Sequence, residues 1–241
     1  SYSDVILVKN KKDLKRTVQD GKLGALLTLE GVDALRGNFA YLRTIYEMGI
    51  RAAGITWNYA NWAADGVMEP RQGGLTAKGK QLVRECNRLG IIMDVSHLSV
   101  RAFWDLAEIC SRPFIASHSN AYSVCPHPRN LNDEQIRAII QSGGMIGITF
   151  VPQFVSTAEN PTISHLLQHI EYICSLGGSD HIGFGSDFDG TDKHMEGLAK
   201  VQHYENLANE LLKRYDAGLV NNWFHNNWYV FLENQLPDDE S

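Results

Sequence analysis

The sequence of 241 residues is poor in the features that mark membrane, secreted and nucleic-acid-binding proteins. No apolar run is long enough to cross a bilayer, and the first residues lack the pattern of a signal peptide. The net charge is −6 and no basic stripe is present, which argues against a nucleic-acid partner. The four cysteines show no CxxC spacing and are too few for a disulfide scaffold, so we expect reduced, partly buried thiols. These absences predict a soluble, cytoplasmic protein.

Two common catalytic motifs are also missing. Ser96-His97 and Ser117-His118 place a hydroxyl beside an imidazole, but the sequence contains no Gly-x-Ser-x-Gly elbow. The glycine-rich run Gly183–Gly190 lacks the Lys-Ser/Thr pair of a phosphate-binding loop. The sequence therefore favours neither a serine hydrolase nor a nucleotide-binding protein.

Two short apolar runs each end in Ser-His, at His97 and at His118, with about one helix between them. Apolar runs bounded by turn residues are typical of buried strands, and a strand–helix–strand unit makes its two strands parallel. Both imidazoles then emerge at the same edge of the sheet, which suggests a metal site. The alternative is that each histidine forms only local hydrogen bonds at the end of its strand.

Alternating strands and helices predict an α/β fold. Six apolar strands are expected to end near Glu30, Thr56, His97, His118, Phe150 and Asp187, and the first is predicted to run without a break from Gly24. Polar residues at most of these ends favour a (β/α)8 TIM-type barrel of the metal-dependent hydrolase type over an open sheet, which would gather its ligand at one switch point. We expect one domain over residues 1–241, with six of the eight barrel strands visible.

Capping residues mark two of the expected helices. Thr76 is expected to cap a helix that runs to Leu89 and stops at Gly90. Asn132 and Gln135 have the spacing of a capping box at the start of another helix. These residues fix the expected ends of two of the segments that separate the strands.

Two imidazoles and two carboxylates follow the predicted strands, namely those of Glu30, His97, His118 and Asp187. Nitrogen and oxygen donors of this kind suit Zn²⁺, and also Mn²⁺, Fe²⁺ or Co²⁺. A carboxylate can bridge two metal ions that hold a hydroxide between them, and a nearby aspartate can pass a proton to a leaving amine. The pattern therefore predicts metal-assisted hydrolysis of an amide, although two metal ions would need further ligands.

Two further residues lie near these strand ends. Arg129 lies in a loop after the His118 strand, where an anionic group of a substrate would be a sensible partner. The alternative for Arg129 is an ion pair on the surface. Asp189 could add a metal ligand beside Asp187, but an Asp-Phe-Asp-Gly turn without a metal is the favoured interpretation.

Four segments, in this order, resemble the membrane (renal) dipeptidase family and its bacterial relatives: Thr28–Gly31, Leu89–His97, Ser117–Leu131 and Gly183–Gly190. The resemblance covers essentially the whole chain, and Ser117–Leu131 is its most specific part. It implies a (β/α)8 zinc metallopeptidase that uses two Zn²⁺ ions to hydrolyse dipeptides through a metal-bridging hydroxide. It also implies tolerance of a D-residue at the C-terminal position, and a homodimer.

The resemblance assigns a role to each candidate residue. Glu30 corresponds to the carboxylate that bridges both metal ions, and His97 and His118 correspond to the imidazoles of the second ion. Asp187 corresponds to the catalytic acid that handles the proton, and Arg129 to the arginine that binds the substrate carboxylate.

The sequence departs from the family pattern in three places. No His-x-Asp pair, which supplies ligands to the first metal ion in the family, precedes Glu30, so we expect that an N-terminal portion with two barrel strands is missing. Trp57 and Asn58 stand where animal members have a histidine, and Asn58 is expected to take over its hydrogen bond to the substrate. Val151 replaces a tyrosine on the substrate side. No lipid-anchor tail follows the last predicted helix, which favours a soluble, bacterial-type enzyme without a membrane anchor.

Two alternatives to a dipeptidase remain open from the sequence. One is another barrel amidohydrolase that acts on a cyclic amide or an N-acyl amino acid. The other is a truncated, non-catalytic form, because a half-built metal site could bind one ion without any chemistry, and a six-stranded sheet would expose two unpaired edges.

Overall fold

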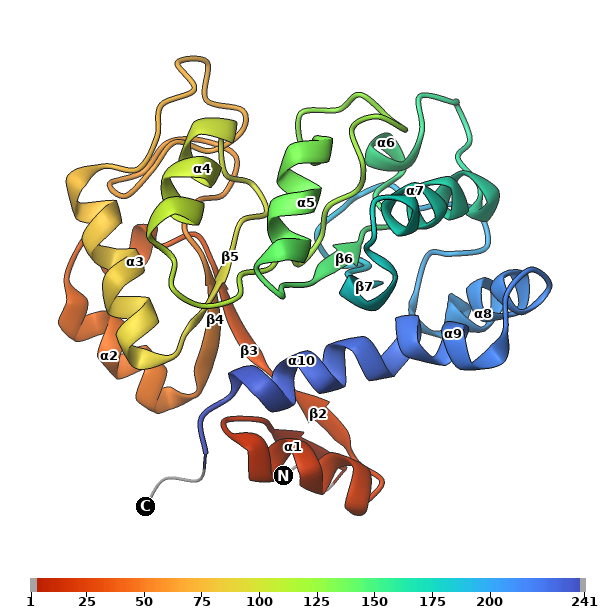
Figure 1. Ribbon diagram of the computed structural model, residues 1–241, viewed down its shortest axis with the longest axis horizontal. Coiled ribbons are helices and arrows are strands. Elements are labelled where there is room, and N and C mark those ends of the chain that lie inside the picture. The colour runs from red at the N-terminus through yellow and green to blue at the C-terminus, as the bar shows by residue number, and fades with distance from the viewer. Residues whose placement is uncertain (1–3, 239–241) are drawn as a thin grey trace. The chain divides into compact units, whose positions relative to one another are not determined.

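The computed structural model describes residues 4–238 as two compact units (Figure 1). Unit 1 contains the chain up to Phe114 and again from Tyr229, and unit 2 contains Ile115–Trp228. Parallel strands and helices alternate in both units, so the predicted α/β class is confirmed.

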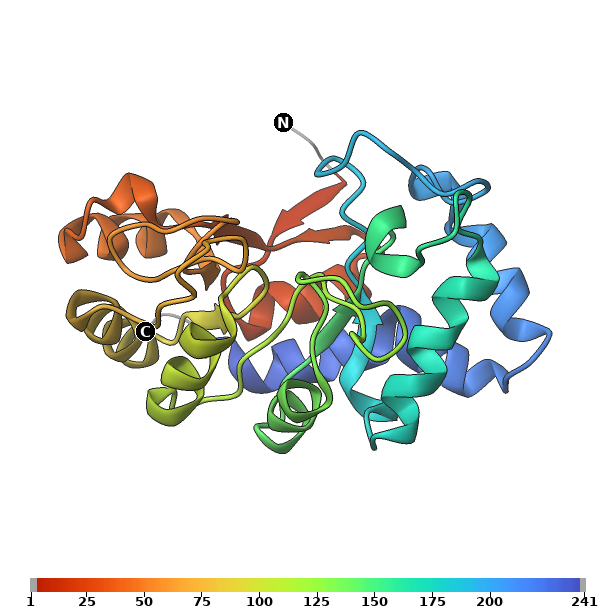
Figure 2. The ribbon, with the colours of Figure 1, turned by 90° about the horizontal axis from the view of Figure 1, so that it is seen from above.

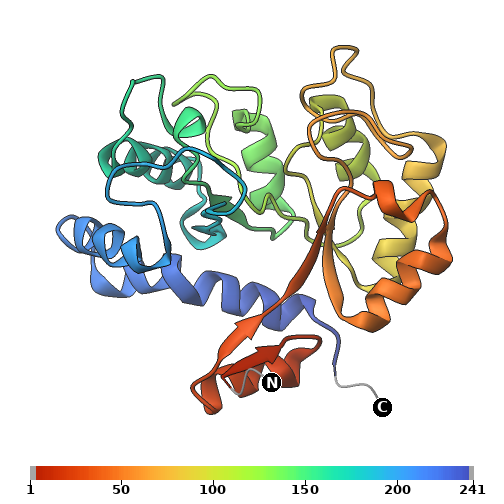
Figure 3. The same cartoon turned by 180° about the vertical axis from the view of Figure 1, so that it is seen from behind.

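Unit 1 contains two small parallel sheets. In the first, β1 (Val5–Leu7) pairs with β2 (Leu23–Ala25). In the second, the order is β3 (Leu27–Glu30), β4 (Ile50–Gly54) and β5 (Ile92–Asp94), and Figure 3 shows β3 beside β4. Glu30 pairs with Gly54 and Gly54 with Asp94, so the three strands of the second sheet end at the same level.

Helices of unit 1 pack on these strands and on one another. They are α1 (Lys11–Gln19), α2 (Phe39–Met48), α3 (Ala77–Leu89) and α4 (Val100–Ile109), with a short 3₁₀ turn at Asp33–Leu35. Helix α2 contacts β4, α3 contacts β5, and α3 also contacts α2 and α4. Figure 2 shows α3 beside α2 and α4. The predicted cap is confirmed, because the Thr76 side chain accepts a hydrogen bond from the Gly79 backbone N–H and α3 stops at Gly90 in the left-handed conformation.

Unit 2 is built around β6 (Ile146–Ile148) and β7 (Ile182–Phe184), which are parallel. Its helices are α5 (Asp133–Gln141), α6 (Pro152–Val155), α7 (Ile163–Ser175), α8 (Tyr204–Leu212) and α9 (Ala217–Asn221). Short 3₁₀ turns cover Ser179–His181 and Val201–His203. A π-helical turn, Asn222–Asn226, leads into α10 (Asn227–Gln235), whose residues from Tyr229 belong to unit 1. The capping box of Asn132 and Gln135 at the start of α5 is confirmed.

Two of the predicted strands differ from the structure. The segment from Gly24 to Glu30 is not one strand, because β2 pairs with β1 whereas β3 pairs with β4, and Leu26 separates them. The strand expected before His118 is not formed, and this segment has only the isolated bridge residues Ile115 and Ala116, of which Ala116 pairs with Ile146. The apolar pattern predicted extended backbone in both places but could not assign the partner of each residue.

The four cysteines are free thiols, as expected from their spacing. Burial raises the pKa of Cys86 to about 12 and that of Cys174 to about 11, so neither thiol ionises near neutral pH. Within residues 4–238, every helix is too short or too polar to span a membrane.

A buried histidine joins three segments of unit 2. His169 on α7 is fully buried, its Nδ1 accepts a hydrogen bond from the Ala121 backbone N–H at 3.1 Å, and its Nε2 donates to the Val155 carbonyl at 2.9 Å. This pair of contacts requires the neutral ring with its proton on Nε2. Burial lowers the pKa of His169 from 6.5 to about 4, because the charged form would lose its hydration.

Replacing His169 should flatten the acid dependence of stability. The folded pKa lies below the unfolded one, so the contribution is complete above pH 6.5 and is lost as the pH falls toward about 4. The loss corresponds to about 3 kcal/mol of unfolding free energy at 1.36 kcal/mol per pKa unit. Urea unfolding of His169→Gln from pH 7 to pH 4 should show a smaller decline than that of the wild type. The exposed His194, changed to Gln, serves as the control and should keep the wild-type slope.

Candidate metal-binding and substrate-binding residues

Two of the predicted metal ligands meet at the strand ends of unit 1. Glu30 is the last residue of β3, and His97 lies three residues beyond the end of β5. The Nε2 atom of His97 is 2.9 Å from Oε1 of Glu30. The His97 side chain is 7% exposed, whereas the Glu30 side chain is 53% exposed. The sheet therefore places a covered imidazole next to a carboxylate that solvent reaches.

The backbone of His97 is held in an unusual conformation. Its φ is +73°, a left-handed value that a residue with a Cβ adopts at a cost of about 1–2 kcal/mol. The His97 carbonyl accepts a hydrogen bond from the Val67 backbone N–H at 2.7 Å and another from the Thr56 hydroxyl at 3.3 Å. Strained residues of this kind persist where the surrounding structure holds them in place, and they concentrate at functional sites.

The ring of His97 has a second partner, Asn58. The Nδ1 atom lies 2.8 Å from the side-chain oxygen of Asn58, which can only accept a hydrogen bond, so Nδ1 carries the proton. In the neutral ring, Nε2 then presents its lone pair toward the Glu30 carboxylate. Two electron-pair donors that point at each other require a cation between them, which is either a second proton on the ring or a metal ion. This donor arrangement fits a metal ion such as Zn²⁺.

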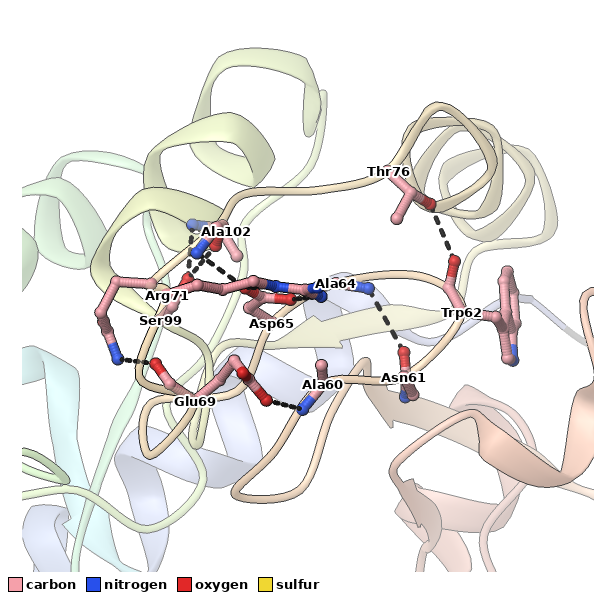
Figure 4. A network of polar contacts seen from close by, with 12 residues as sticks. Ala60, Asn61, Trp62, Ala64, Asp65, Glu69, Arg71, Thr76, Ser99 and Ala102 are labelled. Atoms are coloured by element: carbon pink, nitrogen blue, oxygen red, sulfur yellow. Dashed lines mark hydrogen bonds and ion pairs between the residues drawn. The ribbon is translucent and has the colours of Figure 1, made fainter.

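The loop that carries Asn58 is fixed by a buried carboxylate, Asp65 (Figure 4). Both oxygens of Asp65 accept hydrogen bonds from the guanidinium of Arg71, and Oδ2 also accepts one from the Gly73 backbone N–H at 2.7 Å. The Arg71 hydrogen bond is the main cause of the lowered pKa of Asp65. The Ser99 backbone N–H donates to the Asp65 carbonyl at 3.1 Å, which ties the loop to the start of α4.

The third predicted ligand, His118, belongs to unit 2. Its Nδ1 is 2.7 Å from the hydroxyl of Ser117, which leaves Nε2 as the nitrogen that can reach a metal ion. The segment is tightly enclosed, because a Cβ added at Gly147 or at Gly185 would lie 1.9 Å from the Ser117 carbonyl oxygen. Only glycine therefore fits at these two strand positions beside His118.

Arg129 is 5% exposed, which disagrees with the alternative of a surface ion pair. One of its terminal nitrogens donates to the His118 carbonyl at 3.3 Å, and its guanidinium carbon lies 5.4 Å from the centre of the Phe154 ring. The arginine is thus placed beside the backbone of a predicted metal ligand within unit 2.

Asp187 follows the end of β7 and shares the left-handed backbone of His97, with a φ of +61°. The Gly190 backbone N–H donates to the Asp187 carbonyl at 3.1 Å, and a Cβ at Gly190 would lie 2.0 Å from a carboxylate oxygen of Asp187. Asp189 is exposed in this turn. The turn therefore fixes Asp187 close to the end of its strand.

The structure brings together Glu30, His97 and Asn58 in unit 1, and His118 and Arg129 in unit 2. Two sets of contacts were not predicted. One is the pair of hydrogen bonds that Thr56 and Val67 donate to the His97 carbonyl. The other is the close approach of two strand glycines to the Ser117 carbonyl. The glycines were visible in the sequence, but no local pattern indicates which backbone a strand glycine approaches.

Comparisons with known proteins identify the fold and the family of the chain. A metallopeptidase of Rhodobacter sphaeroides, solved with a phosphinate mimic of the dipeptide L-Ala-D-Ala, superimposes with a TM-score of 0.90 and 30% identity over 98% of this chain and 70% of that one. The fold is therefore that of a metal-dependent peptidase. Residues 1–235 match the family described as membrane dipeptidase (peptidase family M19), and the chain belongs to this family. The predicted family and the predicted class of enzyme, a metal-dependent dipeptidase, are confirmed.

Two relatives show how much of the chain is similar to known proteins. A protein of Klebsiella pneumoniae, described as an uncharacterized protein in the pqqA 5′ region, is 36% identical over 234 residues, which are 92% of this chain and 86% of that protein. The dipeptidase aclJ of Aspergillus oryzae is 36% identical over 198 residues, or 80% of this chain. The chain spans about half of that enzyme, 47% of its length.

A methyl group at Gly185 should disturb the segment that carries His118. In Gly185→Ala, the added Cβ would meet backbone atoms of Ser117 and His118, which cannot rotate away. We expect a loss of about 1–3 kcal/mol in unfolding free energy, as for other overpacked sites, measured by urea unfolding. Gly54→Ala is the matched control, since a Cβ at this strand glycine would make only ordinary contacts, at 3.6 Å or more. Equal stability of the two variants would contradict the packing described here.

Proposed function

We propose that this protein hydrolyses the peptide bond of dipeptides and that Glu30, His97 and His118 bind the divalent metal ions that it uses. The observation that carries the proposal is the contact in unit 1, where a glutamate oxygen and an imidazole nitrogen lie 2.9 Å apart. The three side chains each offer one ligand atom, and this mixture of nitrogen and oxygen donors suits zinc. Membership in the membrane dipeptidase family supports the choice of substrate.

The number of metal ions is part of the proposal. We propose two zinc ions, with Glu30 as the carboxylate that both share and His97 and His118 as ligands of one of them. The sequence has no His-x-Asp pair before Glu30, so the ligands that complete the other ion are not among the residues named here. Metal analysis of the purified protein distinguishes about two equivalents, as expected for the enzyme, from one or none, as expected for the non-catalytic form.

The remaining residues act on the substrate and on the proton. When bound, the metal ions would polarise the peptide carbonyl and activate water as the nucleophile. Asp187 would accept the proton of the water and deliver it to the leaving amine, a task that suits a carboxylate fixed at a strand end. Arg129 would bind the carboxylate of the dipeptide through its planar guanidinium. Asn58 would contact the substrate through its side-chain N–H group.

The pairing of the strands bears on the proposed fold. We propose a (β/α)8 barrel in one domain, which agrees with the parallel pairing of all the strands named above. The Rhodobacter enzyme holds a mimic of L-Ala-D-Ala, so a D-residue at the C-terminal position is a substrate to test here. A homodimer and a cytoplasmic location stay predictions.

Removing one proposed ligand should abolish hydrolysis. Glu30→Gln keeps the size of the side chain but loses its charge, and His118→Ala removes an imidazole. We expect each change to lower kcat/KM by about 10³-fold or more, since metal ions supply several kcal/mol of transition-state stabilisation. Activity is measured on a panel of dipeptides beside cyclic amides and N-acyl amino acids, with and without a chelator. Glu108→Gln, at an exposed position on α4, is the control. Full activity of either ligand variant would refute the assignment, and activity confined to the other amides would favour an amidohydrolase.

Changing Arg129 should affect only substrates that carry a carboxylate. Arg129→Lys keeps the charge but loses the planar pair of donors, so we expect kcat/KM for dipeptides to fall about 10–100-fold. For a dipeptide amide, which lacks the carboxylate, the variant and the wild type should have equal kcat/KM. Arg137→Lys, at an exposed position on α5, controls for the loss of an arginine. An equal loss for both substrates would show that Arg129 maintains the structure and does not bind the carboxylate.

A further inference from the structure

The segment from Thr56 to Val67 holds the backbone of His97, and Asn58 within it contacts the ring. We propose that Asn58 is a positioning residue, which fixes the orientation and the protonated nitrogen of His97 so that Nε2 is ready to bind the metal ion. This inference rests on the proposed function, because it assumes that His97 is a metal ligand.

The direction of the hydrogen bond decides which nitrogen of His97 can bind a metal ion. The Asn58 oxygen is an acceptor, and its distance of 2.8 Å from Nδ1 places the proton on that nitrogen. Nε2 is left with the lone pair, on the side of the ring where Glu30 lies. Histidines that bind metal ions generally donate their other N–H to an oxygen, and the loss of such a partner typically lowers metal affinity 10–100-fold.

Asn58 itself is held through its backbone. The Met68 backbone N–H donates to the Asn58 carbonyl at 2.8 Å. Gly66 packs directly on this part of the chain, because a Cβ at Gly66 would lie 2.3 Å from the Trp57 carbonyl oxygen and 2.4 Å from the Asn58 carbonyl carbon. A side chain at position 66 would therefore push Asn58 away from His97, even though it would not touch the ring.

The neighbouring residue, Asp65, anchors this arrangement. It is buried, and it receives hydrogen bonds from Arg71 and from the backbone of Gly73 (Figure 4). These hydrogen bonds hold the loop in place. The Asn58 carboxamide therefore lies next to the His97 imidazole without a further change in the loop. Such support is what keeps a metal ligand in one orientation.

The two ends of the Asn58 carboxamide can be tested separately. The oxygen contacts His97, whereas the predicted contact with the substrate would use the nitrogen. Asn58→Asp keeps an acceptor for His97 but removes the N–H group, and Asn58→Ala removes both. The positioning role predicts that the aspartate variant retains metal affinity, while a substrate contact alone predicts that both variants change only KM.

The experiment measures zinc affinity by competition with a chromophoric chelator, the absorption spectrum of the Co²⁺-substituted protein, and kcat and KM for a dipeptide. Asn58→Ala should weaken zinc binding about 10–100-fold, alter the Co²⁺ spectrum and lower kcat. Asn58→Asp should restore the affinity and the spectrum. Gly66→Ala should weaken zinc binding as Asn58→Ala does, because it displaces the same group. Tyr59→Ala, at the exposed neighbouring position, is the matched control and should bind zinc like the wild type.

The results separate the inference from the function on which it rests. If the wild type binds zinc and hydrolyses dipeptides while Asn58→Ala keeps its zinc affinity and Co²⁺ spectrum, the positioning role is wrong and the proposed function stands. If the aspartate variant fails to restore binding that the alanine variant has lost, the role of the acceptor is likewise refuted. If the wild type binds no metal ion, the inference and the proposed function fall together.

Discussion

The left-handed backbone of His97 is the constraint on which the candidate site of unit 1 depends. A φ of +73° turns the chain sharply after β5, so that the ring faces the end of β3 and does not continue along the sheet. This turn is unfavourable for a residue with a Cβ, and the hydrogen bonds from Val67 and Thr56 to the His97 carbonyl offset its cost. The sheet and the loop that contains Thr56 and Val67 are therefore both needed to orient the His97 imidazole.

Asp187 in unit 2 has the same kind of left-handed backbone as His97. It too follows a short parallel strand and has a left-handed φ, and Gly190 supplies the room that its carboxylate needs. Two of the residues with predicted chemical roles thus occupy backbone conformations that stability alone would not select. In both places hydrogen bonds to the carbonyl of the left-handed residue hold its backbone.

The sequence was sufficient to predict the strand ends that carry Glu30 and His97, and the reason is local. Glu30 ends one apolar strand and His97 lies three residues beyond another. Parallel pairing aligns the ends of such strands, as the register of Glu30, Gly54 and Asp94 shows. The strand from Gly24 was predicted too long, because apolar character extends without a break across a point where the pairing partner changes from β1 to β4.

Contacts between distant residues could not be predicted in the same way. The hydrogen bond between Asn58 and His97 joins positions 39 residues apart, and it exists because the hydrogen bonds to Asp65 and the packing of Gly66 bring the loop back over the end of the strand. The family resemblance drew attention to Asn58 but assigned it to the substrate. Neither a motif nor a periodicity encodes which nitrogen of an imidazole an amide oxygen will meet.

The unequal exposure of Glu30 and His97 has a consequence for how a metal ion would enter and leave. Solvent reaches the carboxylate, whereas the imidazole is covered and already oriented. An ion arriving from water would meet the exposed carboxylate first, before it reaches the nitrogen of the covered ring. A departing ion would leave the covered imidazole first and the exposed carboxylate last.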